Sequence, residues 1–195
     1  MTVLELAAMD RRMAIGGALA GVAGLALPRR QSRTVNQRGM VGGGLVRFEQ
    51  GEASFSLFVS RLIFSGDDPE VVAGSIIWVD KEANLTLRST AITDYIVPEV
   101  QPEQGVSRQI IGTMSDDAGS EYPFDLEVVD VDLPGSGEDT FNLNVGDGAR
   151  PSANATPISG LGFSYAANGL VARGDIQELD IVIDLATGEA LPAEE

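Results

Sequence analysis

Apolar residues fall on every second position along the segment 122–145, and this alternation constrains the fold more than any other feature of the chain. Side chains of a β-strand point alternately to its two faces, so the pattern predicts strands with one buried face. The apolar positions are Tyr122, Phe124, Leu126, Val128, Phe141, Leu143 and Val145. An acidic turn, Leu-Pro-Gly-Ser-Gly-Glu-Asp, separates them into two runs. The segment is therefore predicted to be the central hairpin of an antiparallel sheet.

The phase of this alternation changes just before the turn. Val129, Val131 and Leu133 are the apolar positions there, and Asp130 and Asp132 lie between them. A change of phase within a strand predicts a bulge or a twist at that point.

The rest of the body consists of short apolar runs separated by Gly, Pro, Asn and Asp. Outside the N-terminal segment, no stretch shows a sustained helical period of 3.6 residues. The expected strands are 45–49, 52–64, 71–80, 85–97 with a bend near Ala91, 107–114, 162–166 and 170–185. The sequence thus predicts an all-β domain over residues 45–186, an antiparallel β-sandwich or barrel of about eight or nine strands.

The N-terminal segment 1–38 resembles an export signal. Arg11 and Arg12 precede Met13–Leu27, an uncharged run rich in Ala, Leu and Gly, and paired arginines before such a run are typical of twin-arginine export. Asp10 before the pair and Ala14-Ile15-Gly16 after it depart from the usual motif, and Gly24-Leu25-Ala26 is the best cleavage site. The alternative, an uncleaved helix, is too short to cross a hydrocarbon core of about 30 Å.

Two further segments are predicted to lie outside the sheet. Residues 39–44 contain four glycines and are expected to form a flexible linker. Residues 187–195 form an acidic tail that is expected to fray.

The body of the chain is strongly acidic. The whole chain has a formal net charge of −16, and six of its 13 basic residues lie in the first 38 positions. Such a surface repels phosphate backbones and anionic lipids, so neither nucleic acid nor an anionic membrane surface is an expected partner. Lys81 is the single lysine. This composition suits either a protein adapted to high salt or an ordinary acidic secreted protein from a GC-rich genome.

The chain contains no histidine and no cysteine. Ser-His-Asp and Cys-His catalysis, histidine metal centres and disulfide bonds are therefore excluded. Neither a Gly-x-Ser-x-Gly motif nor a phosphate-binding Gly loop with Lys is present. A pair of carboxylates, as in glycoside hydrolases, remains the one enzymatic alternative, and the sequence favours a protein without catalytic activity.

Several short motifs occur in an order that resembles a known family. Gly42-Gly43-Gly44 precedes a strand, Gly74–Asp80 contains Trp78, and Leu85–Thr93, Gly112-Thr113, Val129–Asp132 and Arg173–Ile176 follow. The order resembles the post-COAP-1-type extracellular β-rich domain of bacterial surface proteins. The histidines that such domains often carry are absent here, and Arg173-Gly174 stands where a Gly-Gly pair is expected. The resemblance implies a β-rich fold and an extracellular location, and no assigned activity.

The acidic turn of the central hairpin is the best candidate for a metal site. Its carboxylates are Asp130, Asp132, Glu138 and Asp139. Ca²⁺ takes six to eight oxygen ligands, and a hairpin end can gather them, although the spacing differs from that of an EF-hand loop. The alternative is a solvated turn in an acidic protein. Asp116, Asp117 and Glu121 form a second, weaker cluster with the same alternative.

Trp78 and Tyr95 are candidates for stacking on sugar rings, although the apolar strand around Trp78 favours a place in the core. The sequence therefore predicts an exported, non-enzymatic β domain with a structural or binding role at the cell surface or outside the cell. A Ca²⁺- or carbohydrate-binding module is the alternative, and a carboxylate-based glycoside hydrolase is less favoured. The sequence identifies no specific partner, and other cell-surface proteins or glycans are the candidates.

Overall fold

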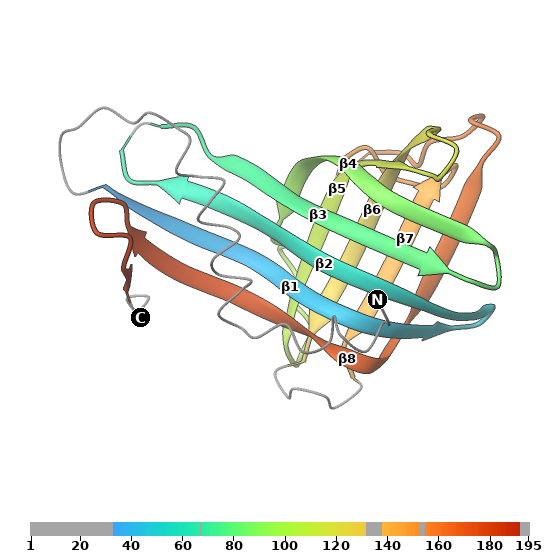
Figure 1. Cartoon of the computed structure of the whole chain (residues 1–195), viewed down its shortest axis with the longest axis horizontal. Helices are drawn as coiled ribbons and strands as arrows, with labels where there is room; N and C mark the ends of the chain where they lie inside the picture. Colours follow the sequence, from blue (N-terminus) through green and yellow to red (C-terminus); the bar gives the residue numbers. More distant parts are fainter. Residues whose placement is uncertain (1–32, 67, 132–137, 153–154, 192–195) are drawn as a thin grey trace.

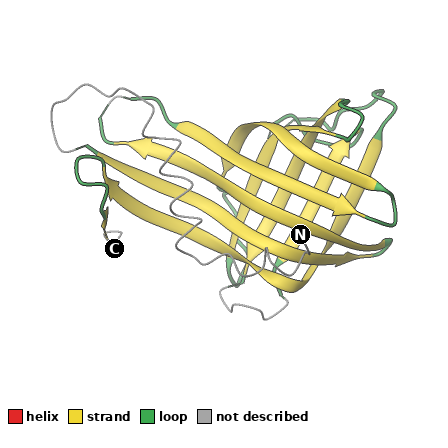
Figure 2. Cartoon of the chain, viewed as in Figure 1, coloured by secondary structure: helices red, strands yellow, loops and turns green. Residues whose placement is uncertain are grey.

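The computed structural model describes residues 33–66, 68–131, 138–152 and 155–191, and these residues form one antiparallel sheet that closes into a barrel (Figure 1). Every regular element among them is a strand, as Figure 2 shows. The strands are β1 (Thr34–Phe48), β2 (Gly51–Phe64), β3 (Val71–Asp80), β4 (Leu85–Ile96), β5 (Val106–Ser115), β6 (Glu121–Asp130), β7 (Thr140–Gly146), β8 (Ser164–Asp184) and β9 (Ala190–Leu191). The predicted all-β class is confirmed, and the closed barrel is the alternative that the chain adopts.

The strands follow one another around the barrel in chain order. Each pairs with the next in antiparallel fashion, and β1 pairs with β8 to close the sheet. Closure satisfies the backbone groups that an open sheet leaves exposed at its edges. The central hairpin is formed by β6 and β7, with Leu126 opposite Leu143.

β3 and β4 are hydrogen-bonded to each other over only part of their length, and the wall of the barrel divides where they separate. These strands pair only over 77–80 and 85–88, after which β4 turns away to pair with β5. Two register shifts in β4, between Ser89 and Ala91 and between Ile92 and Asp94, produce this turn. The predicted bend near Ala91 is therefore confirmed.

Parts of four strands continue beyond the barrel as a single layer, which we call the extension. It comprises 34–41 of β1, 57–64 of β2, 71–75 of β3 and 177–184 of β8, with β9 at its tip (Figure 1). No helix among the described residues has the length and apolar character needed to span a membrane.

Large side chains fill the inside of the barrel. Trp78, Phe124 and Phe141 are completely buried, and the rings of Trp78 and Phe141 stack with centroids 5.2 Å apart. Phe55 packs on Phe141 from the other side, at 4.7 Å. The interior is thus a hydrophobic core rather than a ligand cavity, and any binding site has to lie on the outside or at an end.

The prediction of a linker at 39–44 is wrong, because these residues lie within β1, which begins at Thr34. The glycines allow neighbouring backbones to approach closely. A Cβ on Gly44 would lie 1.9 Å from the carbonyl oxygen of Arg173, and one on Gly39 would lie 2.4 Å from that of Val59. Glycine is required here by contact with other strands, and not by flexibility.

The C-terminal region also differs from the prediction. The two expected strands 162–166 and 170–185 are one 21-residue strand, β8. Gly169, between the two expected strands, lies against the backbone of β1, where a Cβ would be 2.0 Å from the carbonyl oxygen of Arg47. The predicted tail is partly ordered as well, since β9 pairs with Val182 and Ile183 after a turn at Gly188.

The change of phase predicted before the acidic turn does not occur within the described part of β6. Pairing with β7 runs without a register shift from Phe124 to Val129, and Asp130 takes the next inward position, 7% exposed. Asp130 thus occupies a place that the pattern assigns to an apolar residue. Its hydrogen bonds, described below, explain why.

Candidate functional site

Two of the four carboxylates predicted to bind Ca²⁺ hold β8 in place. Asp139 accepts hydrogen bonds from the backbone N–H of Val131 and of Ile176, both at 3.0 Å, one on each carboxylate oxygen. Asp130 accepts one from the N–H of Glu178 at 2.7 Å. Both side chains are buried, Asp139 to 4% exposure.

The reason lies in the path of β8. Its pairing with β7 ends at Leu170, while its pairing with β1 continues to Asp184. Beyond Leu170, the backbone N–H groups of β8 that face away from β1 have no neighbouring strand to bind. A buried N–H group without a hydrogen-bond partner is costly. The carboxylates of Asp130 and Asp139 take the place of that strand, so these residues have a structural role.

The other two predicted ligands do not complete a metal site in the described structure. Glu138 is exposed, and Asp132 lies outside the described residues. Within those residues, no three acidic side chains come together as a metal site would require. A Ca²⁺ ion at Asp139 would compete with two backbone amides for the same oxygens.

The second acidic cluster is also engaged in local contacts. Asp116 accepts the N–H of Ser120 at 2.8 Å and so closes the turn between β5 and β6. Asp117 accepts a hydrogen bond from Arg88 at 2.6 Å, and this contact lowers the pKa of Asp117.

Trp78 and Tyr95 are not available for stacking on sugars, because they are 0% and 4% exposed. The indole N–H of Trp78 donates to the hydroxyl of Tyr165 at 2.9 Å, and that hydroxyl donates to Asp80 at 2.8 Å. Burial, together with the Asp80 carboxylate, raises the pKa of Tyr165. The predicted alternative of a core role for Trp78 is confirmed, and Tyr95 is buried as well.

A polar groove lies on the outer face of β5–β8. The sequence patterns did not reveal the residues that line it. The groove has a volume of about 380 Å³. Its lining consists of Pro98, Gln109, Asp125, Glu127, Asn142, Asn144, Arg150 and Asn168.

Strand register brings these side chains together. Gln109 pairs with Glu127, Glu127 with Asn142, and Asn142 with Asn168, so one row of polar side chains crosses four strands. Asp125 and Asn144 form a second pair in the next row. Paired residues project from the same face of a sheet, and here their neighbours at alternate positions fill the core.

The loop between β7 and β8 contributes Arg150 to the lining of this groove. The carboxylate of Asp147 accepts the N–H groups of Leu161 and Gly162 at 2.8 and 3.2 Å, which ties the two ends of the loop together. Ala149, next to Arg150 in this loop, is completely buried. Arg150 is thereby brought to the groove from outside the sheet.

Asp125 is the unusual member of the groove. It is only 7% exposed, and its Oδ1 is buried without a hydrogen-bond partner. Burial raises the pKa of Asp125, and the Asn144 amide and the Arg150 guanidinium oppose this rise. A buried carboxylate oxygen without a partner is costly, so Asp125 is held in the groove wall at the expense of stability.

The groove as a whole offers planar hydrogen-bonding groups. The carboxylates accept, the Arg150 guanidinium donates, and the amides of Gln109, Asn142 and Asn168 do both. Asp125 and Glu127 are two residues apart on the same strand, so they project in parallel from positions about 7 Å apart. The arrangement suits recognition of a ligand with many hydroxyl groups.

Little in the sequence singles out this groove. Asn142 and Asn144 alternate with core residues, which indicates only an outward-facing strand surface. Arg150 reaches the groove from the connection between β7 and β8, and alternation does not encode that path. The export residues Arg11 and Arg12 lie outside the described residues.

A second cavity, of about 350 Å³, lies where β3 and β4 separate. An ion pair between Arg61 and Glu70 closes part of it. The hydroxyl of Tyr95 is buried near the guanidinium of Arg108, but no hydrogen bond of standard geometry joins them. With Arg61 and Glu70 paired to each other, this cavity offers fewer polar groups to a ligand than the groove.

Comparison of the chain with protein-family models, with curated proteins and with solved structures finds no match. The functional inference therefore depends on the groove itself.

Proposed function

We propose that this protein is an exported, non-enzymatic domain that binds a carbohydrate in the polar groove on the outer face of β5–β8. The observation that carries the proposal is the row of paired polar side chains that crosses four strands in the groove, formed by Gln109, Glu127, Asn142 and Asn168. The carboxylate of this row accepts hydrogen bonds from adjacent sugar hydroxyls, and its amides both donate to them and accept from them.

The charges favour a neutral polyhydroxylated ligand over a metal ion. Only two carboxylates line the groove, and the Arg150 guanidinium acts on Asp125 as a positive charge already in place. Ca²⁺ sites gather more oxygen ligands and carry no cation among them. The net charge of −16 also opposes binding of polyanions.

The same geometry favours binding over hydrolysis. In glycoside hydrolases the two carboxyl groups flank the scissile bond. Asp125 and Glu127 project side by side from one strand, so a sugar in the groove would have both on the same side. The raised pKa of Asp125 is nevertheless the kind of shift that a general acid requires, so hydrolysis is the second candidate.

Export is proposed from the N-terminal sequence, in which Arg11 and Arg12 precede an uncharged run. An extracellular place suits a glycan ligand, and it agrees with the resemblance to post-COAP-1-type domains. Replacing both arginines with lysine should retain the protein inside the cell, as measured by fractionation. Secretion of that variant at the original level would remove the twin-arginine part of the proposal.

Carbohydrate binding is tested by a glycan array followed by isothermal titration with the glycans that bind. Asp125→Ala should weaken binding at least about tenfold, equivalent to about 1.4 kcal/mol. Glu121→Ala is the matched control, because Glu121 lies on the outward face of the same strand but outside the groove. An array without any bound glycan, with folding verified by circular dichroism, would contradict the proposal.

The same samples separate the alternatives. Release of reducing sugar from a bound glycan, lost in both Asp125→Asn and Glu127→Gln, would show hydrolysis instead. A melting temperature that rises with Ca²⁺ and falls with EDTA would show a metal site. We expect neither effect.

A further inference from the structure

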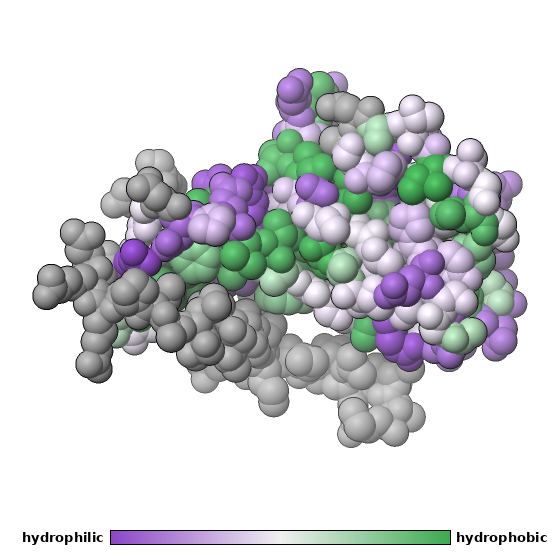
Figure 3. Space-filling model, turned by 90° about the horizontal axis from the view of Figure 1, so that it is seen from above, coloured by the Kyte–Doolittle hydropathy of each residue, from purple (hydrophilic) through white to green (hydrophobic). Residues whose placement is uncertain are grey.

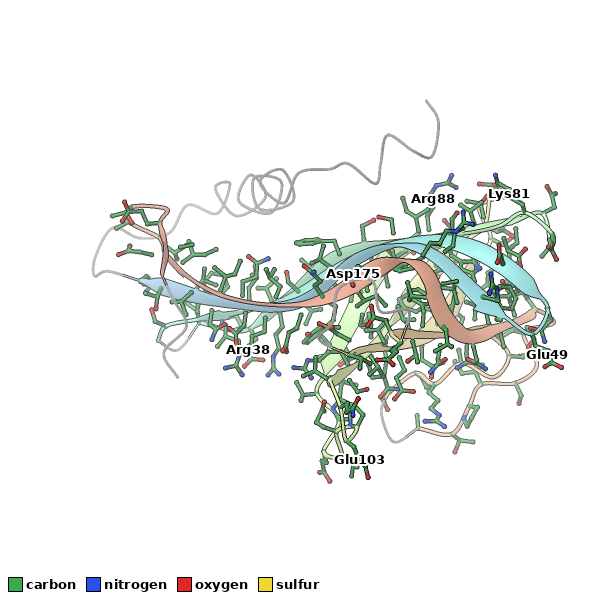
Figure 4. All side chains as sticks on the ribbon, turned by 90° about the horizontal axis from the view of Figure 1, so that it is seen from below. Arg38, Glu49, Lys81, Arg88, Glu103 and Asp175 are labelled. Carbon is green, nitrogen blue, oxygen red and sulfur yellow. The ribbon has the colours of Figure 1, made fainter. Side chains whose placement is uncertain are left out.

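The extension has an apolar face and a charged face. Val35 pairs with Phe64 on one side and with Ile183 on the other, so the three side chains share one face. Arg38, three positions further along β1, pairs with Arg61 and with Asp180, so these three side chains lie on the opposite face. Figure 4 shows the Arg38 side chain projecting from that charged side.

The apolar face is buried in the structure. Val35 is 1% exposed, Leu62 8%, Phe64 9% and Ile183 6%. Ser60 and Gln37 lie among them and satisfy each other through a hydrogen bond of 3.3 Å. Apolar residues also gather along the extension in the space-filling view (Figure 3).

The described residues provide only one layer of strands at the extension. An apolar face of a single sheet becomes stable when a second element covers it. The element that covers this face therefore has to come from outside the described residues or from another molecule.

The N-terminal part of the chain has the composition and length for this role. Residues 13–27 carry no charge and include Ile15, Leu19 and Val22. As a helix, fifteen residues would be about 22 Å long. The seven positions of β1 from Thr34 to Met40 span about 23 Å.

The chain also enters the sheet at the right place. β1 begins at Thr34, at the tip of the extension and next to Val35. The six residues 28–33 connect the apolar run to this point and reach at most about 20 Å. The run therefore cannot move far from the apolar face.

We propose that residues 13–27 of the same chain pack on the apolar face of the extension. A second copy of the protein is a weaker occupant, because each copy brings a net charge of −16 to the contact. The proposal is independent of carbohydrate binding in the groove. It does affect export, since the segment must leave the extension before the export machinery or a peptidase can bind it.

The test uses thiol labelling, because the natural chain contains no cysteine. Ser60→Cys introduces one thiol into the apolar face with little change in volume. Maleimide should label this thiol in the full-length chain at least about tenfold more slowly than after Leu19→Asp and Val22→Asp are added. Arg38→Cys, on the charged face, is the control and should change less than about twofold.

Equal labelling of the Ser60→Cys thiol with and without the aspartates would overturn the proposal. Protection that disappears on dilution of the protein would identify a second copy as the occupant and would also overturn it. A chain that begins at Gln31 provides the second variant: if it folds, its thiol should be labelled rapidly. Glycan binding by any of these variants reports on the groove alone.

Discussion

At the scale of single residues, the buried hydroxyls of Tyr165 and Tyr95 differ in what they contact. The Tyr165 hydroxyl joins the Trp78 indole to the Asp80 carboxylate, whereas the Tyr95 hydroxyl has no hydrogen-bond partner. Burial raises the pKa of Tyr95 to about 12, against the influence of the nearby Arg108, so both tyrosines are neutral at physiological pH.

Tyr165→Phe and Tyr95→Phe should therefore differ in their effect on stability. The first leaves the Trp78 N–H unsatisfied in the core and should lower the free energy of unfolding by about 1–3 kcal/mol. The second removes a group without a partner and should change it by less than about 0.5 kcal/mol. Urea denaturation of both variants measures the difference, and equal losses would contradict the hydrogen-bond network.

Asp125 gives the groove a pH dependence. Its pKa is raised in the folded state above the ordinary value of 3.8, so the folded protein holds this proton more tightly than the unfolded chain does. Asp125 therefore contributes less to stability as pH rises through the interval between 3.8 and the raised pKa.

Asp125→Asn removes this ionisation. The variant should be more stable than the natural protein at pH 7, by about 1 kcal/mol, and the difference should disappear as pH falls below the unfolded-state pKa. Thermal melts across this range are the measurement. Glu121→Asn, at an exposed position on the same strand, is the matched control for the substitution itself. A stability difference for Asp125→Asn that grows toward low pH would mean that folding lowers the pKa of Asp125 instead of raising it.

At the scale of the elements, two adjacent glycines of β1 test why the strand contains a glycine run. A Cβ on Gly44 would lie 1.9 Å from the carbonyl oxygen of Arg173, whereas the nearest atom to a Cβ on Gly43 would be 3.5 Å away. Gly44 thus lies where β1 and β8 approach closely, next to the register shift between Leu45 and Val46.

Gly44→Ala should lower the free energy of unfolding by about 1–3 kcal/mol, because backbone atoms cannot move aside as a flexible side chain can. Gly43→Ala is the matched control and should be neutral or slightly stabilising, since alanine restricts the unfolded chain. Chemical denaturation of the two variants compares them directly. If residues 39–44 were a flexible linker, both substitutions would be tolerated equally.

One edge of β8 is held by acidic side chains whose role the alternation of apolar residues does not explain. Asp130 and Asp139 bind backbone amides that β7 no longer reaches. From the sequence, Asp130 suggested a change of phase because an acid stood at an inward position. Only the divergence of β7 and β8 shows why an acid is needed there.

At the scale of the whole molecule, the charge distribution should determine how stability depends on salt. The chain has 29 acidic and 13 basic residues, and the described ion pairs, such as Arg47–Glu52, are mostly exposed. Exposed pairs contribute little, so repulsion among the excess carboxylates should dominate.

The melting temperature should accordingly rise by about 3 °C or more between low salt and molar NaCl, which corresponds to about 1 kcal/mol. Most of the rise should occur below about 0.5 M, where the Debye length shortens fastest. An equal concentration of sucrose serves as an uncharged control for solvent exclusion. A melting temperature that does not change with NaCl would remove self-repulsion as a determinant of stability.

The sequence by itself determined the class of fold, the approximate positions of the strands and the kinds of chemistry that are excluded. Alternation in segments such as 122–128 requires one buried and one solvent-exposed face of the strand. The absence of histidine and cysteine follows from composition alone. The bend near Ala91 and the burial of Trp78 followed from local residue types. These properties depend on near neighbours along the chain.

The tertiary structure decided which of many similar side chains act together. Gln109, Glu127, Asn142 and Asn168 are distant in sequence, and only the register of four strands forms them into one row. Asp125, Asn144 and Arg150 line the same groove only because strand register and the connection between β7 and β8 bring them together. Contacts between distant segments set these features, and a pattern of period two has no information about which strands meet or where they separate.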